Sequence, residues 1–242
     1  MPTLLIIAGP NGSGKTTFTR SLVELDRFPV DAYINPDDIA QTMPGGWHHA
    51  ENFLPAAQEA DRRRQQRLSE GLDIVFETVF SSSGKLDFLR KAKASGYDVH
   101  LNFLCTENPA IHAARVCERV MNHGHSVPIE KIISRYFRSI ELAVHAIDSV
   151  TTARFFDTTA HNTAPKLVAW ISDGAMALED DLPQWIRPVV DRGSRIFSVG
   201  NLSQEEERLL PNEAAEQARE KMRRQGCEPI PAETANGQDR ES

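Results

Sequence analysis

A glycine-rich run that ends in Lys-Thr near the start of the sequence has the residue types that bind phosphate. Residues 9–16 read GPNGSGKT and match the G-x-x-x-x-G-K-[ST] pattern in full. Glycines let backbone N–H groups approach phosphate oxygens without a Cβ clash, and the following helix directs its positive end at them. Lys15 adds a cation for the β- and γ-phosphates, and the Thr16 hydroxyl can ligate Mg²⁺. The segment predicts an ATP or GTP site with Mg²⁺, formed by Gly9, Pro10, Asn11, Gly12, Ser13, Gly14, Lys15, Thr16 and Thr17.

Two acids that follow short apolar segments could act beside this loop. Asp37 comes just after residues 32–34, where an acid could orient an acceptor hydroxyl and accept its proton. An acid in the first turn of a helix is also favoured by the helix dipole alone, so a capping role competes with this one. Glu77 ends an apolar run, as a Walker-B acid would, and Thr78 beside it could bind polar groups of an acceptor.

Four arginines in the middle of the chain could neutralise a transferring phosphoryl group. Arg115 and Arg119 lie one turn apart on a predicted helix, and Arg135 and Arg138 follow a turn that contains Gly124. Such a helix pair is typical of a lid, which can close guanidinium groups onto the phosphates and exclude water. The alternative is that these arginines form surface salt bridges, and for Arg115 and Arg138 the two interpretations have equal weight.

The elements that must position these residues alternate between strands and helices. This alternation predicts a doubly wound, mainly parallel α/β sheet of the P-loop type with a helical lid, and ligands at the carboxyl ends of its strands. Strands are predicted at residues 4–8, 32–34, 73–76, 99–104 and 154–156. Helices are predicted at about residues 15–25, 52–70, 85–94, 108–121 and 128–146.

Length and composition are those of a globular protein. The 242 residues are 40% hydrophobic, and we assign residues 1–200 to one kinase-like domain and residues 201–242 to a charged, flexible tail without aromatic residues. A net charge of −7 argues against general affinity for nucleic acid. The sequence has no run of about 18 apolar residues and no signal peptide, so we expect a cytoplasmic protein without a membrane partner.

Several other residues have simpler interpretations. The three cysteines lack the spacing of a disulfide framework or a zinc site, and we expect reduced thiols. Trp170 and Trp185 are expected to be packing residues. A solvated helix face is predicted for four arginines, Arg62, Arg63, Arg64 and Arg67.

Taken in order, these segments resemble the zeta toxin family of P-loop kinases, especially its small bacterial members. The matching pieces are AGPNGSGKTT, INPD, FETVFS, RVMNHGHSVPIEKIISRYFRS and FDTT. The resemblance covers residues 3–169. In two places the chain departs from the pattern of small members: the lid turn reads His123-Gly124-His125 instead of Gly-Gly-His, and Asp157-Thr158-Thr159 replaces Asp-Asn-Ser.

The resemblance implies an ATP-dependent kinase that phosphorylates a hydroxyl of a sugar nucleotide, UDP-N-acetylglucosamine in the characterised toxins. It implies that Lys15 and Thr16 bind phosphate and Mg²⁺ and that Asp37 is the general base. By the same resemblance, Glu77 lies beside the acceptor, and Asp157 falls in the segment that approaches the nucleotide base. It also implies two lid arginines, Arg119 and Arg135.

Two rival functions and one partner hypothesis follow from the same residues. A kinase for another small molecule, such as an antibiotic or a sugar, would share every motif except the acceptor contacts. A regulatory protein that hydrolyses ATP without an acceptor would need the loop but not Asp37. A toxin requires neutralisation, so an antitoxin protein that blocks the nucleotide site is a further hypothesis.

Overall fold

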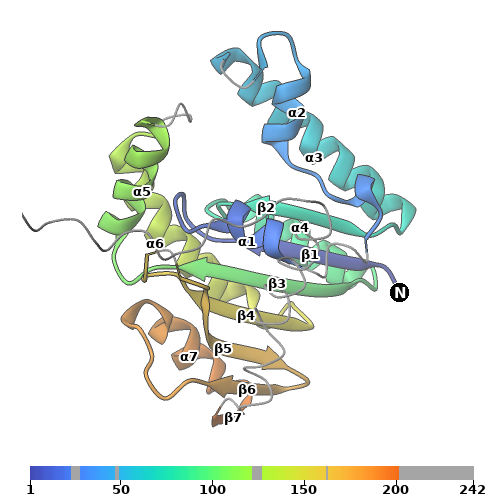
Figure 1. The fold of residues 1–242 in the computed structure, drawn as a ribbon. Coiled ribbons are helices and arrows are strands. Elements are labelled where there is room, and N and C mark those ends of the chain that lie inside the picture. Colours follow the sequence, from blue (N-terminus) through green and yellow to red (C-terminus); the bar gives the residue numbers. More distant parts are fainter. Residues whose placement is uncertain (23–27, 47–48, 122–126, 162, 202–242) are drawn as a thin grey trace, which may run out of the picture.

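The computed structural model describes residues 1–22, 28–46, 49–121, 127–161 and 163–201 and is built on a seven-stranded sheet (Figure 1). The strand order is β2-β1-β3-β4-β5-β6-β7. The strands are β1 (Thr3–Ala8), β2 (Ile74–Thr78), β3 (Asp98–Cys105), β4 (Thr152–Asp157), β5 (Lys166–Ser172), β6 (Ala175–Leu178) and β7 (Ser198–Asn201). The helices are α1 (Lys15–Ser21), α2 (Pro36–Thr42), α3 (Phe53–Glu70), α4 (Ser83–Ala94), α5 (Pro109–Met121), α6 (Ile129–Ala146) and α7 (Arg187–Gly193).

The first four strands of the sheet are parallel, so the predicted α/β fold is confirmed. Alternate side chains of a strand point to opposite faces, and both faces are buried here. Leu4 and Ile6 of β1 belong to a core shared with α4, α6 and α7, whereas Leu5 and Ile7 pack with Phe18 of α1. Helices therefore cover both faces, and the carboxyl ends of the parallel strands stay open to ligands.

An antiparallel extension completes the sheet, and no strand beyond residue 156 was expected from the sequence. Strand β5 is antiparallel to both β4 and β6, and β7 then runs parallel to β6. A parallel connection needs a crossover of a dozen or more residues, usually a helix. Only eight residues, 158–165, separate β4 from β5, and those of them that the structure describes form no helix. The return strand is therefore antiparallel.

The strand predicted at residues 32–34 is wrong. A short 3-10 helix (Val30–Ala32) comes first, and then only Tyr33 forms a bridge, to Val75 of β2. The Ile34 N–H also donates to the Val75 carbonyl, but Pro36 begins α2 immediately afterwards. Because proline lacks an N–H donor and starts a helix well, the pairing cannot extend into a strand.

The solvated arginine face predicted on α3 is only half correct. Arg62 and Arg63 are exposed and pair with Glu59. Arg64, by contrast, is 4% exposed, and its guanidinium carbon lies 4.8 Å from the centre of the Phe76 ring. Arg67 is also mostly buried and donates to the Asp73 carbonyl at 2.7 Å. Arginine stems pack on apolar surface while their heads find acceptors, so these two side chains join α3 to β2.

Parts of three predicted segments lie outside the described residues: the end of the first helix, the Gly124 turn and residues 202–242 of the tail. Among the helices that the structure describes, none is both long and apolar enough to span a bilayer.

Candidate functional site

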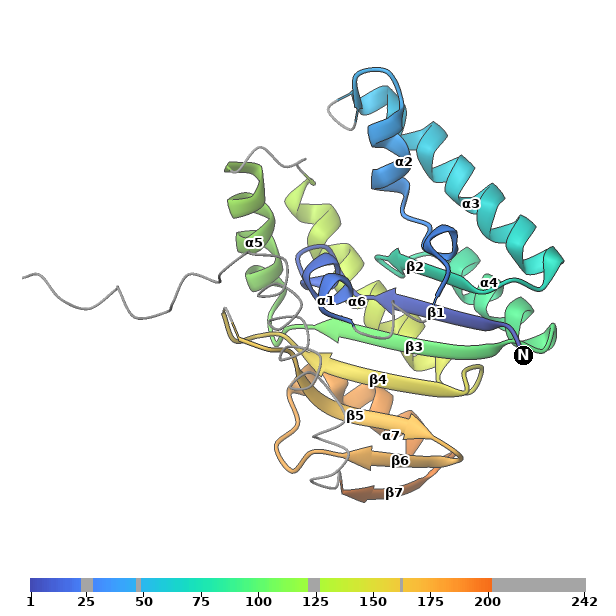
Figure 2. The same ribbon diagram turned by 45° about the vertical axis from the view of Figure 1, so that its right-hand side comes forward.

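The phosphate loop connects β1 to α1 at the carboxyl edge of the sheet (Figure 2). Gly9 has φ +146 and Gly12 has φ +80, backbone conformations that other residues rarely adopt. A Cβ at Gly9 would lie 2.1 Å from the Leu104 carbonyl oxygen, and one at Gly12 would lie 2.7 Å from the His112 carbonyl oxygen. The two glycines are therefore required both for the path of the loop and for its packing against β3 and α5.

Lys15 is folded onto this loop. Its Nζ donates to the carbonyls of Gly9 and Pro10, each at 2.8 Å. Burial lowers the pKa of Lys15 to about 8; the positive charge of Arg119 also lowers it, while Glu77 and Asp37 raise it. These influences place two acids and a second cation near the amine. An anionic ligand in the loop would favour the charged form of Lys15 and compensate for its desolvation.

A chain of hydrogen bonds connects the loop to the start of α2. The Thr16 hydroxyl donates to Glu77 Oε2 at 2.9 Å, and the Tyr33 hydroxyl donates to Glu77 Oε1 at 2.7 Å. Asn35 Nδ2 in turn donates to the Tyr33 oxygen at 3.2 Å. Burial and the Glu77 charge raise the pKa of Tyr33 well above its usual range, so its proton stays in place. The Glu77 carboxylate is thus held by two donors, the hydroxyls of Thr16 and Tyr33.

Asp37 lies in the first turn of α2. The N-cap Asn35 accepts the Asp37 N–H at 3.0 Å through its side-chain oxygen, which fixes the start of the helix. Asp37 itself is exposed. Partial burial and the charges of Asp37 and Glu77 raise the pKa of Asp38. Three carboxylates therefore stand on the α2 side of the loop, and both the helix-capping and the catalytic interpretations of Asp37 fit this position.

Thr78 supports the loop through its backbone. Its carbonyl accepts the Gly9 N–H at 3.2 Å, and its hydroxyl accepts the Phe80 N–H at 3.1 Å. Phe80 is fully buried and has φ 56, a strained value for a residue with a side chain. The predicted acceptor contact of Thr78 stays a prediction.

Helices α5 and α6 bring the predicted arginines to the opposite side of the loop (Figure 2). Arg135 Nη1 donates to Asn11 Oδ1 at 3.1 Å. Arg119 is close enough to lower the pKa of Lys15 by its charge. Arg115, which the sequence left undecided, donates to the Thr158 carbonyl at 2.6 Å and so connects α5 to the end of β4, while Arg138 is exposed.

The middle of α6 is anchored to the residues that follow β2 and β3. The Tyr136 hydroxyl donates to the Thr106 carbonyl at 2.9 Å, and the Ser139 hydroxyl donates to the Val79 carbonyl at 2.6 Å. Both side chains are buried. The part of α6 that carries Arg135 is therefore fixed on the sheet, and the predicted lid movement stays a prediction.

A hollow of about 260 Å³ adjoins the phosphate loop. Thr17, Phe18, Arg115 and Thr158 are among the side chains that line it. Asp157, predicted to lie near the nucleotide base, is not among the described residues that line this hollow. Its carboxylate instead accepts hydrogen bonds from the Thr159 N–H and hydroxyl and from Trp185 Nε1, the last at 2.8 Å. Its nucleotide contact stays a prediction.

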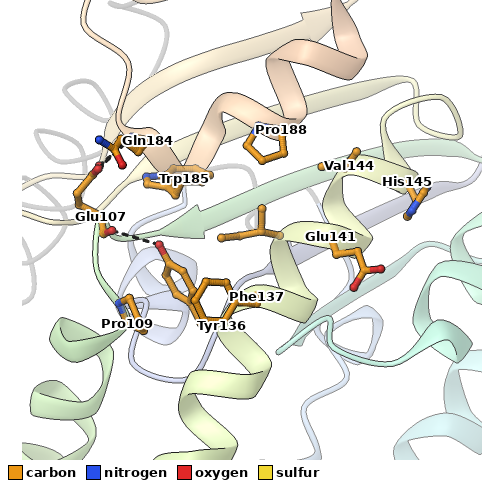
Figure 3. Close-up of a pocket in the computed structure, with 11 residues that line it drawn as sticks. Glu107, Pro109, Tyr136, Phe137, Glu141, Val144, His145, Gln184, Trp185 and Pro188 are labelled. Atoms are coloured by element: carbon orange, nitrogen blue, oxygen red, sulfur yellow. Dashed lines mark hydrogen bonds between the residues drawn. The ribbon is translucent and has the colours of Figure 1, made fainter.

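A larger hollow of about 540 Å³ lies between α6 and α7, and no residue of the phosphate loop lines it. Figure 3 shows Tyr136 and Phe137 from α6 facing Trp185 and Pro188 across it. Glu107 joins the two sides, because its carboxylate accepts the Gln184 N–H at 3.0 Å while its carbonyl accepts the Tyr136 hydroxyl. This hollow contains none of the predicted site residues and is mainly aromatic and aliphatic.

Mg²⁺ fits the donors at the loop. Among the described residues, no three His, Cys, Asp or Glu side chains gather as a metal cluster. Kinase sites hold Mg²⁺ with one or two protein oxygens, and phosphate and water oxygens supply the rest. The paired oxygens of Thr16 and Glu77 match that chemistry.

Sequence reasoning missed two residues that contact the site. Tyr33 was assigned to a strand, although its position just before Asn35 places it beside the loop. His112 lies in the helix predicted at residues 108–121 and was given no role, yet its Nδ1 lies 2.9 Å from the Asn11 carbonyl oxygen. Neither spacing matches a motif, so only the fold could reveal these contacts.

The fold and the loop together define a P-loop nucleotide-binding protein of the α/β class. The chain belongs to the zeta toxin family, because the family model for zeta toxins matches residues 1–163. The resemblance that the sequence carries is therefore confirmed.

Three proteins that resemble this chain share little of its sequence. An uncharacterized protein of Haemophilus influenzae is 27% identical over 133 residues, which are 54% of this chain and 91% of the relative. A chain of the AvrRxo1-ORF1:AvrRxo1-ORF2 crystal structure with sulphate ions has a TM-score of 0.60 at 20% identity; the match covers 82% of this chain but only 64% of that one. The PezAT toxin–antitoxin structure from Streptococcus pneumoniae has a TM-score of 0.52 at 13% identity, with coverages of 93% and 87%. At these identities the similarity shows the fold alone.

Proposed function

We propose that the protein is a kinase that transfers the γ-phosphoryl group of ATP to a hydroxyl group of a small molecule. The observation that carries the proposal is the gathering of Lys15, the Thr16–Glu77 pair and Arg135 around one phosphate loop. Membership of the zeta toxin family supports it. A crystal structure of the AvrRxo1-ORF1:-ORF2 complex, which has a similar fold, contains ATP.

The cations of the loop and of the helix pair would stabilise the transferred group. Phosphoryl transfer spreads negative charge over oxygens of the γ-phosphate, and fixed positive charges lower the energy of that state. Lys15 would bind these oxygens from the loop, and Arg119 and Arg135 would do so from α5 and α6. Mg²⁺, held by Thr16 and Glu77, would supply further charge neutralisation at the β- and γ-phosphates.

Asp37 is proposed as the general base. It stands on the α2 side of the loop, exposed to an incoming acceptor, whereas the arginines approach from α5 and α6 (Figure 2). An acceptor hydroxyl between Asp37 and the γ-phosphate would give its proton to the carboxylate as its oxygen attacks phosphorus. Glu77 would lie beside the acceptor, as the zeta toxin resemblance implies.

For the acceptor we propose a sugar nucleotide such as UDP-N-acetylglucosamine, the substrate that the zeta toxin resemblance implies.

The partner proposed on the same ground is an antitoxin protein that covers the nucleotide site. The PezAT structure and the AvrRxo1 complex describe proteins of this fold that assemble with a second protein. A pull-down from the source cells that retains a specific protein, released by excess ATP, would support an antitoxin at this site. Retention of no such protein would count against it.

The test of the base is Asp37→Ala, with Asp87→Ala on the exposed side of α4 as the matched control. Asp37→Ala should reduce transfer to the acceptor by at least about a hundredfold, because general bases contribute roughly 10²–10⁴. ATP affinity should stay close to that of the wild type. Equal transfer rates in the Asp37 variant and the wild type would rule out Asp37 as the base.

A panel of sugar nucleotides, simple sugars and antibiotics incubated with γ-labelled ATP would test the acceptor. Label on a sugar nucleotide supports the full proposal, and label on another compound keeps the kinase but replaces its substrate. Label in free phosphate alone, unchanged by Asp37→Ala, would favour the regulatory ATPase instead.

A further inference from the structure

The backbone of the phosphate loop is held from α5 by a buried histidine. His112 is 0% exposed, and its Nδ1 lies 2.9 Å from the Asn11 carbonyl oxygen. Gly12, the next loop residue, packs directly on the backbone of His112, where a Cβ would come within 2.7 Å of the carbonyl oxygen. The contact therefore joins two segments that are 101 residues apart in the chain.

The chemistry of this contact fixes the tautomer of His112. A backbone carbonyl only accepts hydrogen bonds, so Nδ1 must carry the proton. Burial lowers the pKa of His112 to about 4, and the ring is neutral near pH 7. Nε2 then has a lone pair, and it has no hydrogen-bond partner in the described part of the chain. One edge of the ring thus holds the loop, while a face or edge packs on Tyr136 with the ring centroids 5.4 Å apart.

Holding the Asn11 carbonyl also orients the Gly12 N–H. No described peptide bond is cis, and in a trans peptide the C=O and N–H point in opposite directions. The Gly12 N–H must therefore face away from His112. Glycine imposes little restriction on its own backbone, so the peptide on its amino side turns easily unless something outside the loop fixes it.

We propose that His112 is a positioning residue that fixes the Asn11–Gly12 peptide in the orientation that binds phosphate. The inference rests on the proposed nucleotide-binding role of the loop and adds a residue that no motif contains. Arg135 assists by holding the Asn11 side chain at 3.1 Å. Without the Nδ1–H donor, only part of the molecules would present the Gly12 N–H correctly, and the apparent affinity for phosphate would fall in proportion.

Three variants separate this role from simple packing. Asparagine places its amide nitrogen as many bonds from Cα as Nδ1, so His112→Asn keeps the donor while it removes much of the ring. His112→Gln places its amide where Nε2 lies, and His112→Phe keeps the ring and its Tyr136 contact without any donor. If His112 positions the loop, His112→Asn should bind nucleotide most tightly of the three variants. If His112 only fills space, His112→Phe should bind nucleotide most tightly and His112→Asn least tightly.

The measurement is the Kd of ADP and of ATP by titration calorimetry at a temperature where each variant is folded, with Glu118→Gln on the exposed side of α5 as the control. We expect His112→Phe and His112→Gln to weaken binding about tenfold, the value of one buried hydrogen bond. His112→Asn should bind within about threefold of the wild type. In steady-state kinetics the loss should appear in KM for ATP more than in kcat. If the wild type binds nucleotide and the affinity falls in the order His112→Phe, His112→Gln, His112→Asn, the positioning role alone is overturned. A folded wild type that binds neither nucleotide would overturn the proposed function and this inference with it.

Discussion

The Thr16 hydroxyl donates a hydrogen bond of 2.9 Å to the Glu77 carboxylate, although 61 residues separate them. The contact follows from the sheet: β1 and β2 are parallel neighbours, and Ala8 pairs with Thr78 at their carboxyl ends. The loop that begins at Gly9 therefore starts beside the end of β2. This arrangement brings a hydroxyl and a carboxylate together where the metal of a nucleotide complex would lie.

Glu77→Gln should raise the Mg²⁺ concentration needed for half-maximal activity. The amide oxygen can still accept the Thr16 hydroxyl, but the negative charge that attracts the cation is lost. We expect a shift of about 10- to 100-fold, the range seen when a residue that supports a metal site is altered. Initial rates measured as a function of Mg²⁺ concentration test this shift, with Glu118→Gln as the control. A sample with excess chelator gives the rate without free Mg²⁺. An unchanged Mg²⁺ dependence would contradict a metal role for Glu77.

Tyr33→Phe should lower both activity and stability, because it removes the donor to Glu77 Oε1. The free energy of unfolding should fall by about 1 kcal/mol, the net value of one hydrogen bond. Since the folded state raises the pKa of Tyr33, its contribution is complete below pH 10 and is lost as the pH rises further. Denaturant titrations from pH 7 to 11 should show the difference between variant and wild type shrinking above pH 10.

The matched control for Tyr33 is Tyr97→Phe. Tyr97 also donates through its hydroxyl, to the Arg67 and Leu72 carbonyls, far from the phosphate loop. Tyr97→Phe should lower the free energy of unfolding by a similar amount without changing the rate of phosphotransfer. Equal losses of rate in the two variants would show that Tyr33 acts only through stability.

Nucleotide binding should be accompanied by proton uptake near pH 8. Burial lowers the pKa of Lys15 to about 8, so about half of the amines are neutral there, and the bound phosphates should restore the charge. Binding enthalpies measured in buffers of different ionisation enthalpy should reveal about half a proton taken up per nucleotide at pH 8 and almost none at pH 6. Lys15→Met should abolish the buffer dependence. Its persistence in that variant would assign the proton to another group.

The same low pKa of Lys15 affects stability in the absence of ligand. The unfolded chain binds a proton more tightly at this position than the folded chain does, because the reference pKa is 10.5. The contribution of Lys15 to the free energy of unfolding should therefore rise between pH 8 and pH 10.5. A comparison of wild type and Lys15→Met isolates this contribution from that of Tyr33.

Asp157→Asn should destabilise the protein by about 1–3 kcal/mol, since a buried donor loses its acceptor. Either orientation of the amide places an NH₂ group against a donor, whether the Thr159 N–H or Trp185 Nε1. Thermal unfolding followed by tryptophan fluorescence measures the loss, with Asp87→Asn as the control. A loss of nucleotide affinity without a loss of stability would instead support the base contact that the resemblance implies.

The sequence by itself determined the fold class and the phosphate loop, because both depend on local patterns. Glycines at fixed spacing, a lysine and a threonine after an apolar run need no distant partner to be recognised. Local patterns also predicted the starts of the helices at Lys15 and Pro36. They predicted the strands that lead to Glu77 and Asp157 as well. The order of these segments was also enough to indicate the zeta toxin family, which the match over residues 1–163 confirmed.

Only the tertiary structure decided which side chains support the loop. Tyr33 and His112 contact residues of the site that are 44 and 101 positions away in the chain. The burial of Arg64 depends on the ring of Phe76, on which its guanidinium packs. The antiparallel return of β5 likewise follows from a connection too short for a crossover helix. Local periodicity shows which residues a strand or helix buries, but strand order and helix packing decide which distant residues meet.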